Sequence, residues 1–174
     1  IAIGHAETMV AGGMESMTNA PYLLAKMRGG ARIGHHSVTD SMFLDGLEDA
    51  YDKGRLMGTF AEDCAVTYQF SRAAQDDYAL TSLSRARTAQ DDGSFAAGIS
   101  RGTVVSRKGE VVVEVDEQPG AAGPEKIPTL KPALRKDGTV TAANASSISD
   151  GAAALVLSAG GGRARILGHA SHAQ

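Results

Sequence analysis

The sequence contains no tryptophan, a single cysteine and few aromatic residues, which make up 5% of its 174 residues. One cysteine, Cys64, excludes a disulfide bond within the chain and fits a reducing compartment, so we expect a cytoplasmic protein. Positive charge is not in excess either, because the formal net charge is −3. This charge argues against a general nucleic-acid-binding protein. No apolar run approaches the length of a membrane-spanning helix, and we therefore expect no membrane partner.

Small residues are abundant instead. The 21 glycines and the hydrophobic fraction of 43% suit close-packed α/β layers that are joined by many turns. The opening residues do not resemble a signal peptide. Because the chain begins with Ile1 in the middle of a pattern, we expect it to be part of something longer or a processed product.

Three segments have the composition of strands. Residues 8–11 form a short apolar strand that Gly12 and Gly13 are expected to stop. Residues 152–157 are apolar without alternation, which predicts a strand buried on both faces. Residues 163–168 are interpreted as a last strand.

Two helices are predicted in the middle of the chain. Thr59 and Glu62 form a capping-box pattern, which predicts a helix from about Phe60 to Tyr68. Ser71 is a suitable N-cap for a second helix, which Gly93 can end. The apolar residues of the second helix predict one buried stripe and its charged residues a solvated face. The stripe comprises Ala79, Leu83 and Ala86, and the charged residues include Asp76, Asp77, Arg85 and Arg87.

The remaining segments indicate turns and an excursion from a sheet. Residues 103–106 and 110–115 predict a hairpin, and residues 116–138 predict an extended, turn-rich connection. If the strands at 8–11 and 152–157 lie in one sheet, residues 18–138 form an inserted subdomain. This order of elements is typical of a layered α/β fold.

A loop of small polar residues, Asn144 to Gly151, directly precedes the second apolar strand. Such a loop lets another group approach the backbone closely, and it favours a ligand site at the end of the strand. The alternative is an ordinary turn that leads into a core strand.

The sequence predicts no metal site. His35 and His36 are adjacent, and on a strand their side chains would diverge, while His169 and His172 have no carboxylate beside them. Cys64 is interpreted as a buried structural thiol, because it lies among apolar residues of a helix.

Four motifs, in order, resemble those of the thiolase family. They are AGGMESM with NAP at residues 11–21, MGTFAE at 57–62, SRAAQD at 71–76 and GTVTAANAS with DGAA at 138–153. The resemblance covers almost the whole chain. Thiolases are coenzyme A (CoA)-dependent acyltransferases that cleave 3-ketoacyl-CoA with CoA or condense two acyl-CoA molecules. CoA and acyl-CoA are their substrates, and the resemblance implies no further cofactor.

The resemblance also implies an architecture. Thiolases have an α/β fold of αβαβα layers with an inserted α+β loop domain that holds CoA. Residues 1–17 and 139–174 are then strands of the N-terminal half, and residues 18–138 are the CoA-binding loop domain. In thiolases the loop corresponding to residues 31–45 bridges dimers into tetramers, so a homo-oligomer, a dimer or a tetramer, is expected in the full-length context.

The catalytic motifs of the family are missing from these residues. The cysteine nucleophile, the histidine of Gly-His-Pro and the acid/base cysteine of Cys-Gly-Gly-Gly have no counterpart here, and no catalytic residue is assigned. A Claisen condensation needs an activated thiolate and a second acid/base group, so this chain alone is expected to be inactive. Gly160 to Gly162 stand where thiolases usually have a helix, so that helix has been removed or the chain is a spliced or incomplete version.

The resemblance assigns CoA contacts to five positions. Ser146 corresponds to the serine that hydrogen-bonds the pantetheine arm and Ala142 to an alanine of the same channel. Met57 and Leu56 stand beside the acyl pocket, and Leu134 stands beside the adenine. A local hydrogen bond of Ser146 and a core position for Met57 are the structural alternatives. Basic residues that could contact the phosphates are Lys126, Lys131, Arg135 and Lys136, with ordinary solvated charge as the alternative.

Two functions follow from these observations. The first is the CoA-binding part of a thiolase, and the alternative is a non-catalytic, thiolase-derived fragment or interaction module.

Overall fold

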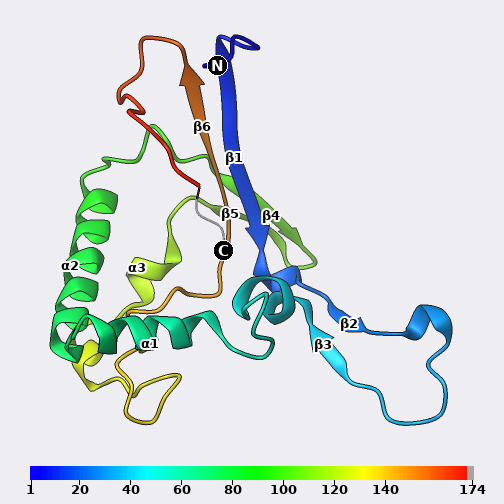
Figure 1. Ribbon diagram of the computed structural model, residues 1–174. Helices are drawn as coiled ribbons and strands as arrows, with labels where there is room; N and C mark the ends of the chain where they lie inside the picture. Colours follow the sequence, from blue (N-terminus) through cyan, green and yellow to red (C-terminus); the bar gives the residue numbers. More distant parts are fainter. Residues whose placement is uncertain (172–174) are drawn as a thin grey trace.

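Two helices and three two-stranded antiparallel ribbons dominate the computed structural model, which describes residues 1–171, so that His172 lies outside the described part (Figure 1). The strands are β1 (Thr8–Ser16), β2 (Tyr22–Leu24), β3 (Val38–Asp40), β4 (Gly102–Ser106), β5 (Gly109–Val113) and β6 (Asp150–Ser158). The helices are α1 (Met57–Thr67), α2 (Arg72–Asp91) and α3 (Glu117–Ala121), with short helical turns η1 (Met17–Asn19), η2 (Met27–Gly29), η3 (Phe43–Leu47) and η4 (Pro124–Thr129).

The first and last strands pair with each other. Strands β1 and β6 are antiparallel in a register that runs from Thr8 opposite Ser158 to Ser16 opposite Asp150. This pairing confirms that the two strands share one sheet. The prediction that Gly12 and Gly13 stop the first strand was wrong, because β1 continues to Ser16. Gly12 is instead required by close packing, since a Cβ atom there would collide with the carbonyl oxygen of Ala153.

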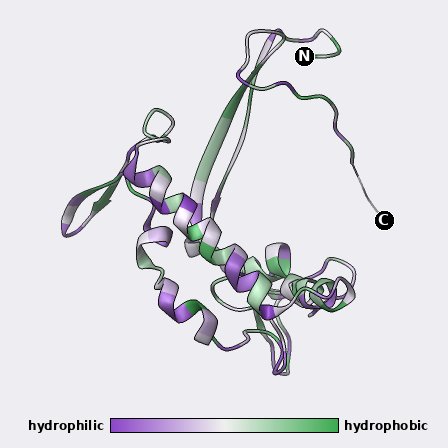
Figure 2. Cartoon of the chain, turned by 90° about the vertical axis from the view of Figure 1, so that its left-hand side faces the viewer, coloured by the Kyte–Doolittle hydropathy of each residue, from purple (hydrophilic) through white to green (hydrophobic). Residues whose placement is uncertain are grey.

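The β1–β6 ribbon is exposed, although its sequence is apolar. It extends away from the helices in two perpendicular views, with hydrophobic residues along its length (Figures 1 and 2). Val10 is 68% and Val156 is 73% exposed, so the prediction that residues 152–157 are buried on both faces was wrong for the described chain. Within residues 1–171 no third strand pairs with this ribbon and no helix packs closely over it. The strand predicted at residues 163–168 is likewise irregular, because no strand of the described chain lies beside it to share hydrogen bonds.

Helix α1 begins earlier than predicted and is capped differently. It starts at Met57, and the hydroxyl group of Thr59 donates a hydrogen bond to the Leu56 carbonyl at 2.7 Å. Glu62 does not return to the helix start, so the capping-box prediction was wrong. Cys64 is exposed, contrary to the predicted buried thiol, and the buried residues of α1 are Glu62 and Ala65 instead.

Helix α2 confirms the predicted N-cap. The hydroxyl oxygen of Ser71 accepts a hydrogen bond from the Ala74 N–H at 3.2 Å, and the helix ends at Asp91, just before Gly93. Contrary to the prediction of a solvated face, two of its charged residues are not solvated. Asp76 is 5% exposed and pairs with Arg72 at 2.8 Å, and Arg87 reaches the segment around α3.

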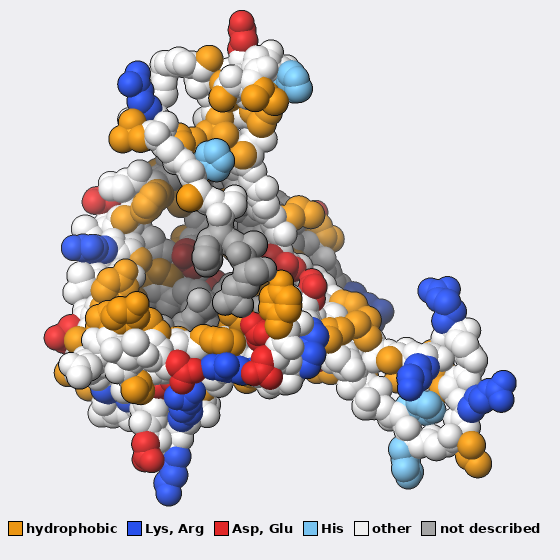
Figure 3. Space-filling model, viewed as in Figure 1, with side chains coloured by type: hydrophobic (Ala, Val, Ile, Leu, Met, Phe, Trp, Pro, Cys, Tyr) orange, Lys and Arg blue, Asp and Glu red, His pale blue; other side chains and the backbone are white. Residues whose placement is uncertain are grey.

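The hairpin was predicted correctly, since β4 and β5 pair from Gly102 opposite Val113 to Ser106 opposite Gly109. The connection at residues 116–138 is turn-rich, as expected, and contains α3 and η4. Strands β2 and β3 form a thin arm that projects from the side of the molecule opposite helix α2 (Figure 1). Around its tip, side chains of Lys and Arg lie together with those of His (Figure 3).

Candidate functional site

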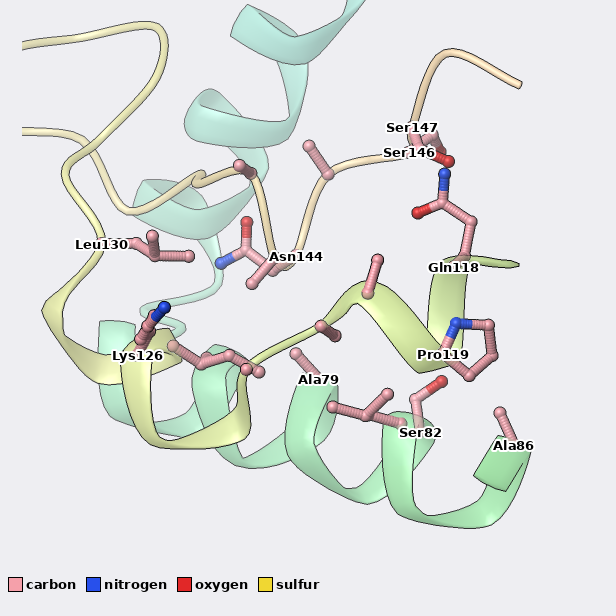
Figure 4. Close-up of a pocket in the computed structure, with 18 of the residues that line it drawn as sticks. Ala79, Ser82, Ala86, Gln118, Pro119, Lys126, Leu130, Asn144, Ser146 and Ser147 are labelled. Atoms are coloured by element: carbon pink, nitrogen blue, oxygen red, sulfur yellow. The ribbon is translucent and has the colours of Figure 1, made fainter. Parts of the chain in front are cut away.

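A pocket of about 600 Å³ lies between α2, the α3–η4 segment and the loop that leads to β6 (Figure 4). One face of it is apolar. Ala79, Leu83 and Ala86, the predicted stripe of α2, form this face together with Pro119 and Ile127. Ile127 is 5% exposed and belongs to the small core of the described chain. The stripe is therefore half-buried rather than buried as predicted, and it lines the pocket.

Polar groups complete the lining. Tyr78 and Ser82 come from α2 itself, and the others come from α3, η4 and the loop: Gln118, Lys126, Asn144, Ser146 and Ser147. An apolar pocket with a few polar groups is the usual form of a small-molecule site in proteins. The composition suits a ligand with an apolar chain, some hydrogen-bonding groups and negative charge near Lys126.

Glu62 holds the start of the pocket loop. The residue is 2% exposed, and its carboxylate accepts hydrogen bonds from the N–H groups of Thr139, at 2.9 and 3.1 Å, and Val140, at 3.0 Å. Burial raises the pKa of Glu62, but the hydrogen bonds from Thr139 and Val140 outweigh it, and the pKa lies below its ordinary value. A Cβ atom on Gly138 would collide with this carboxylate, so the approach requires glycine.

Asn144 fixes the turn that follows. Its side-chain oxygen accepts from the Thr141 N–H at 2.7 Å, and its side-chain nitrogen donates to the Thr139 carbonyl at 3.0 Å. Thr141 itself has no exposed surface. Gln75 of α2 adds a hydrogen bond to the Thr139 hydroxyl group at 2.9 Å. The loop that presents Ser146 is thus held by both α1 and α2.

Two arginines of α2 hold the wall of the pocket that α3 and η4 form. Arg87 donates to the carbonyl groups of Pro119 at 2.9 Å and Ala122 at 2.6 Å, and Arg72 donates to the carbonyl group of Ile127 at 3.0 Å. This role was not predicted from the sequence, although a signal was present. Arg72 lies four residues before Asp76 and Arg87 lies four residues after Leu83, so they continue the buried face.

Two of the five predicted contact residues, Ala142 and Ser146, line this pocket. Leu56, Met57 and Leu134 do not. Leu134 packs against Gly58 at the start of α1, Leu56 pairs with Glu48 through a backbone bridge, and Met57 is 48% exposed. These three residues form a separate group around the beginning of α1.

The four basic residues predicted as possible phosphate contacts also lie in different places. Lys126 lines the pocket, whereas Lys131 and Lys136 are exposed outside its lining. Arg135 donates to Asp63 at 2.6 Å, and this hydrogen bond holds the pKa of the Asp63 carboxyl group below its ordinary value. Arg135 therefore links its own segment to α1.

Neither a metal site nor a membrane helix is found in residues 1–171. No three His, Cys, Asp or Glu side chains in this range are grouped to hold a metal ion. None of its helices has the length and apolarity needed to cross a membrane.

Comparisons with known proteins give the family. Residues 1–160 match the family described as "Thiolase, N-terminal domain". The chain is 46% identical over 158 residues to a "Probable acetyl-CoA acetyltransferase" of Dictyostelium discoideum, covering 90% of this chain and 38% of that protein. It is 47% identical over 156 residues to the mouse protein "Acetyl-CoA acetyltransferase, mitochondrial", covering 88% of this chain and 36% of that protein.

A solved structure agrees with these matches. The "Structure of Acetyl-CoA acetyltransferase from Syntrophomonas wolfei" superimposes with a TM-score of 0.80 at 42% identity, covering 90% of this chain and 40% of that one. The chain belongs to the thiolase family and has its α/β fold. It spans about two fifths of the length of these relatives. One relative is named mitochondrial, so the cytoplasmic location stays a prediction.

Proposed function

We propose that this chain is the CoA-binding part of an acetyl-CoA acetyltransferase. The observation that carries the proposal is the pocket between α2, α3 and the loop of Ser146, because two predicted contact residues line it. The names of the relatives supply the acyl-CoA chemistry. In this proposal residues 18–138 are the loop domain, and residues 1–17 and 139–174 belong to the N-terminal half.

The pocket suits the pantetheine arm of CoA. The arm is a flexible chain with two amide groups, and it can lie against the apolar residues of α2. The Ser146 hydroxyl group then hydrogen-bonds one amide, and Ala142 leaves room for the chain beside it. Lys126 is the basic side chain of the pocket lining that can meet a phosphate of CoA.

The acyl group is carried elsewhere in this proposal. No cysteine of this chain matches a catalytic motif of the family, and the one cysteine present, Cys64, is exposed on α1. The chain then contributes binding and orientation of CoA, and the thiolate and acid/base groups come from other parts of the enzyme. The rival function, a non-catalytic binding module, is favoured by Leu56, Met57 and Leu134 lying outside the pocket.

Assembly with a second copy is part of the same proposal. The β2–β3 arm and the adjoining turn η3 expose apolar side chains: on the arm Ile33 is fully exposed and Val38 is 58% exposed, and in η3 Phe43 is 39% exposed. A projecting arm with exposed apolar residues cannot bury them by itself, and such surfaces usually mark contacts.

Titration calorimetry of CoA into the purified chain tests the binding proposal. One hydrogen bond contributes about 0.5–1.5 kcal/mol, so Ser146→Ala should weaken CoA roughly twofold to tenfold. Ser84→Ala is the matched control, because Ser84 is exposed on α2 and outside the pocket lining. If Ser146→Ala binds CoA as the unmodified chain does, the assignment of Ser146 is wrong. If the unmodified chain binds no CoA, the rival function is favoured.

A further inference from the structure

Gln118 lies on α3, on the wall of the pocket that faces the Ser146 loop. In Figure 4 its side chain points from α3 toward Ser146 and Ser147. Within residues 1–171 its side-chain amide makes no hydrogen bond, whereas its backbone N–H does. The donor and acceptor atoms of this amide are therefore available to a ligand in the pocket.

The backbone on both sides of Gln118 is held in place. The Gln118 N–H donates to the Asp116 carboxylate at 3.2 Å, which caps α3. The carbonyl group of Asp116 accepts from the side chain of Gln90 at 3.0 Å, and the carbonyl group of Pro119 accepts from Arg87 at 2.9 Å.

The residues next to Gln118 add to this rigidity. Pro119 is buried and has a fixed φ angle. Gln118 is therefore presented from a fixed segment, and less order has to be gained when a ligand binds.

We propose that Gln118 is a second ligand-contact residue, which together with Ser146 holds one amide of the pantetheine arm between opposite walls of the pocket. This inference rests on the proposed function, since it takes CoA as the ligand. A planar trans amide directs its N–H and C=O in opposite directions. A hydrogen-bonding side chain on each wall matches that geometry, and the Gln118 amide and the Ser146 hydroxyl group can each donate or accept.

The test is calorimetric titration of CoA into the chain carrying Gln118→Ala or Gln118→Met. The methionine keeps the length of the side chain and removes its amide. Both variants should bind CoA roughly twofold to tenfold more weakly than the unmodified chain. Glu117→Ala is the control on the same helix, because Glu117 is exposed and outside the pocket lining. Circular dichroism melting of each variant checks that the fold is intact.

The possible outcomes separate the inference from the function on which it rests. If both Gln118 variants bind CoA normally while Ser146→Ala binds it more weakly, the inference is overturned and the proposed function stands. If Glu117→Ala weakens CoA as much as Gln118→Ala, the effect belongs to α3 as a whole and the inference is also overturned. If the unmodified chain binds no CoA, the proposed function fails and the inference fails with it.

Discussion

Replacing Glu62 by Gln should destabilise the fold in a pH-dependent way. The carboxylate accepts hydrogen bonds from two backbone N–H groups and from the Thr139 hydroxyl group, at 2.9 to 3.3 Å. An amide keeps one acceptor oxygen and turns an N–H donor toward the other backbone N–H. With Glu62 only 2% exposed, losing a charge-assisted bond and leaving a buried donor unpaired should cost about 2–4 kcal/mol.

The sign of the pH effect follows from the lowered pKa of Glu62. A carboxyl group with a lower pKa in the folded state stabilises the fold above its unfolded pKa of about 4.3. That contribution is lost as the pH falls through the folded pKa, because the protonated carboxyl group resembles the amide. The stability difference between the two proteins should be full at neutral pH and should shrink below a pH of about 4.

Urea unfolding followed by circular dichroism, repeated from neutral to acidic pH, measures this difference. Other carboxyl groups titrate equally in both proteins and cancel in the comparison. Glu117→Gln is the control, because Glu117 is exposed on α3 and makes no side-chain hydrogen bond or ion pair in residues 1–171. A difference that stays constant on acidification, or that does not exceed the control, would refute the role of Glu62.

Three further outcomes are expected. Gly138→Ala should also destabilise the chain, because its Cβ atom would collide with the Glu62 carboxylate, and an unchanged urea midpoint would contradict this contact. The purified chain should not cleave acetoacetyl-CoA with CoA, since it offers no nucleophile of the family motifs, and turnover that survives Cys64→Ser would show that the chemistry has been misjudged. In a full-length version, replacing Val38 and Phe43 by Ser should lower the oligomer mass measured by light scattering, and an unchanged mass would exclude these two residues from assembly.

The candidate site was partly predictable from the sequence. Ser146 and Ala142 came from a resemblance in motifs, and both line the pocket. Nothing in the sequence around Gln118 indicated a ligand contact, because its role depends on α3 lying opposite the loop of Ser146.

The remaining three contacts that the resemblance assigned behave differently. Met57 lies in one of the four motifs, whereas Leu56 and Leu134 stand outside them, and all three gather at the start of α1. A motif identifies a residue type and an order along the chain, whereas the pocket depends on which segments pack together.

Local features were determined by the sequence alone. The N-cap of α2 and the β4–β5 hairpin depend on residues within a few positions of one another. Their short-range hydrogen bonds do not depend on how distant segments pack.

Long-range partners were decided only by the tertiary structure. Glu62 had a plausible local partner at Thr59, yet it binds backbone groups 77 and 78 residues away. The apolar strand β6 was expected to be buried, but burial requires a covering layer, and the described chain supplies one neighbouring strand and no layer above it. A side chain takes the partner that leaves the fewest buried groups unpaired, and packing between distant segments decides which groups are buried.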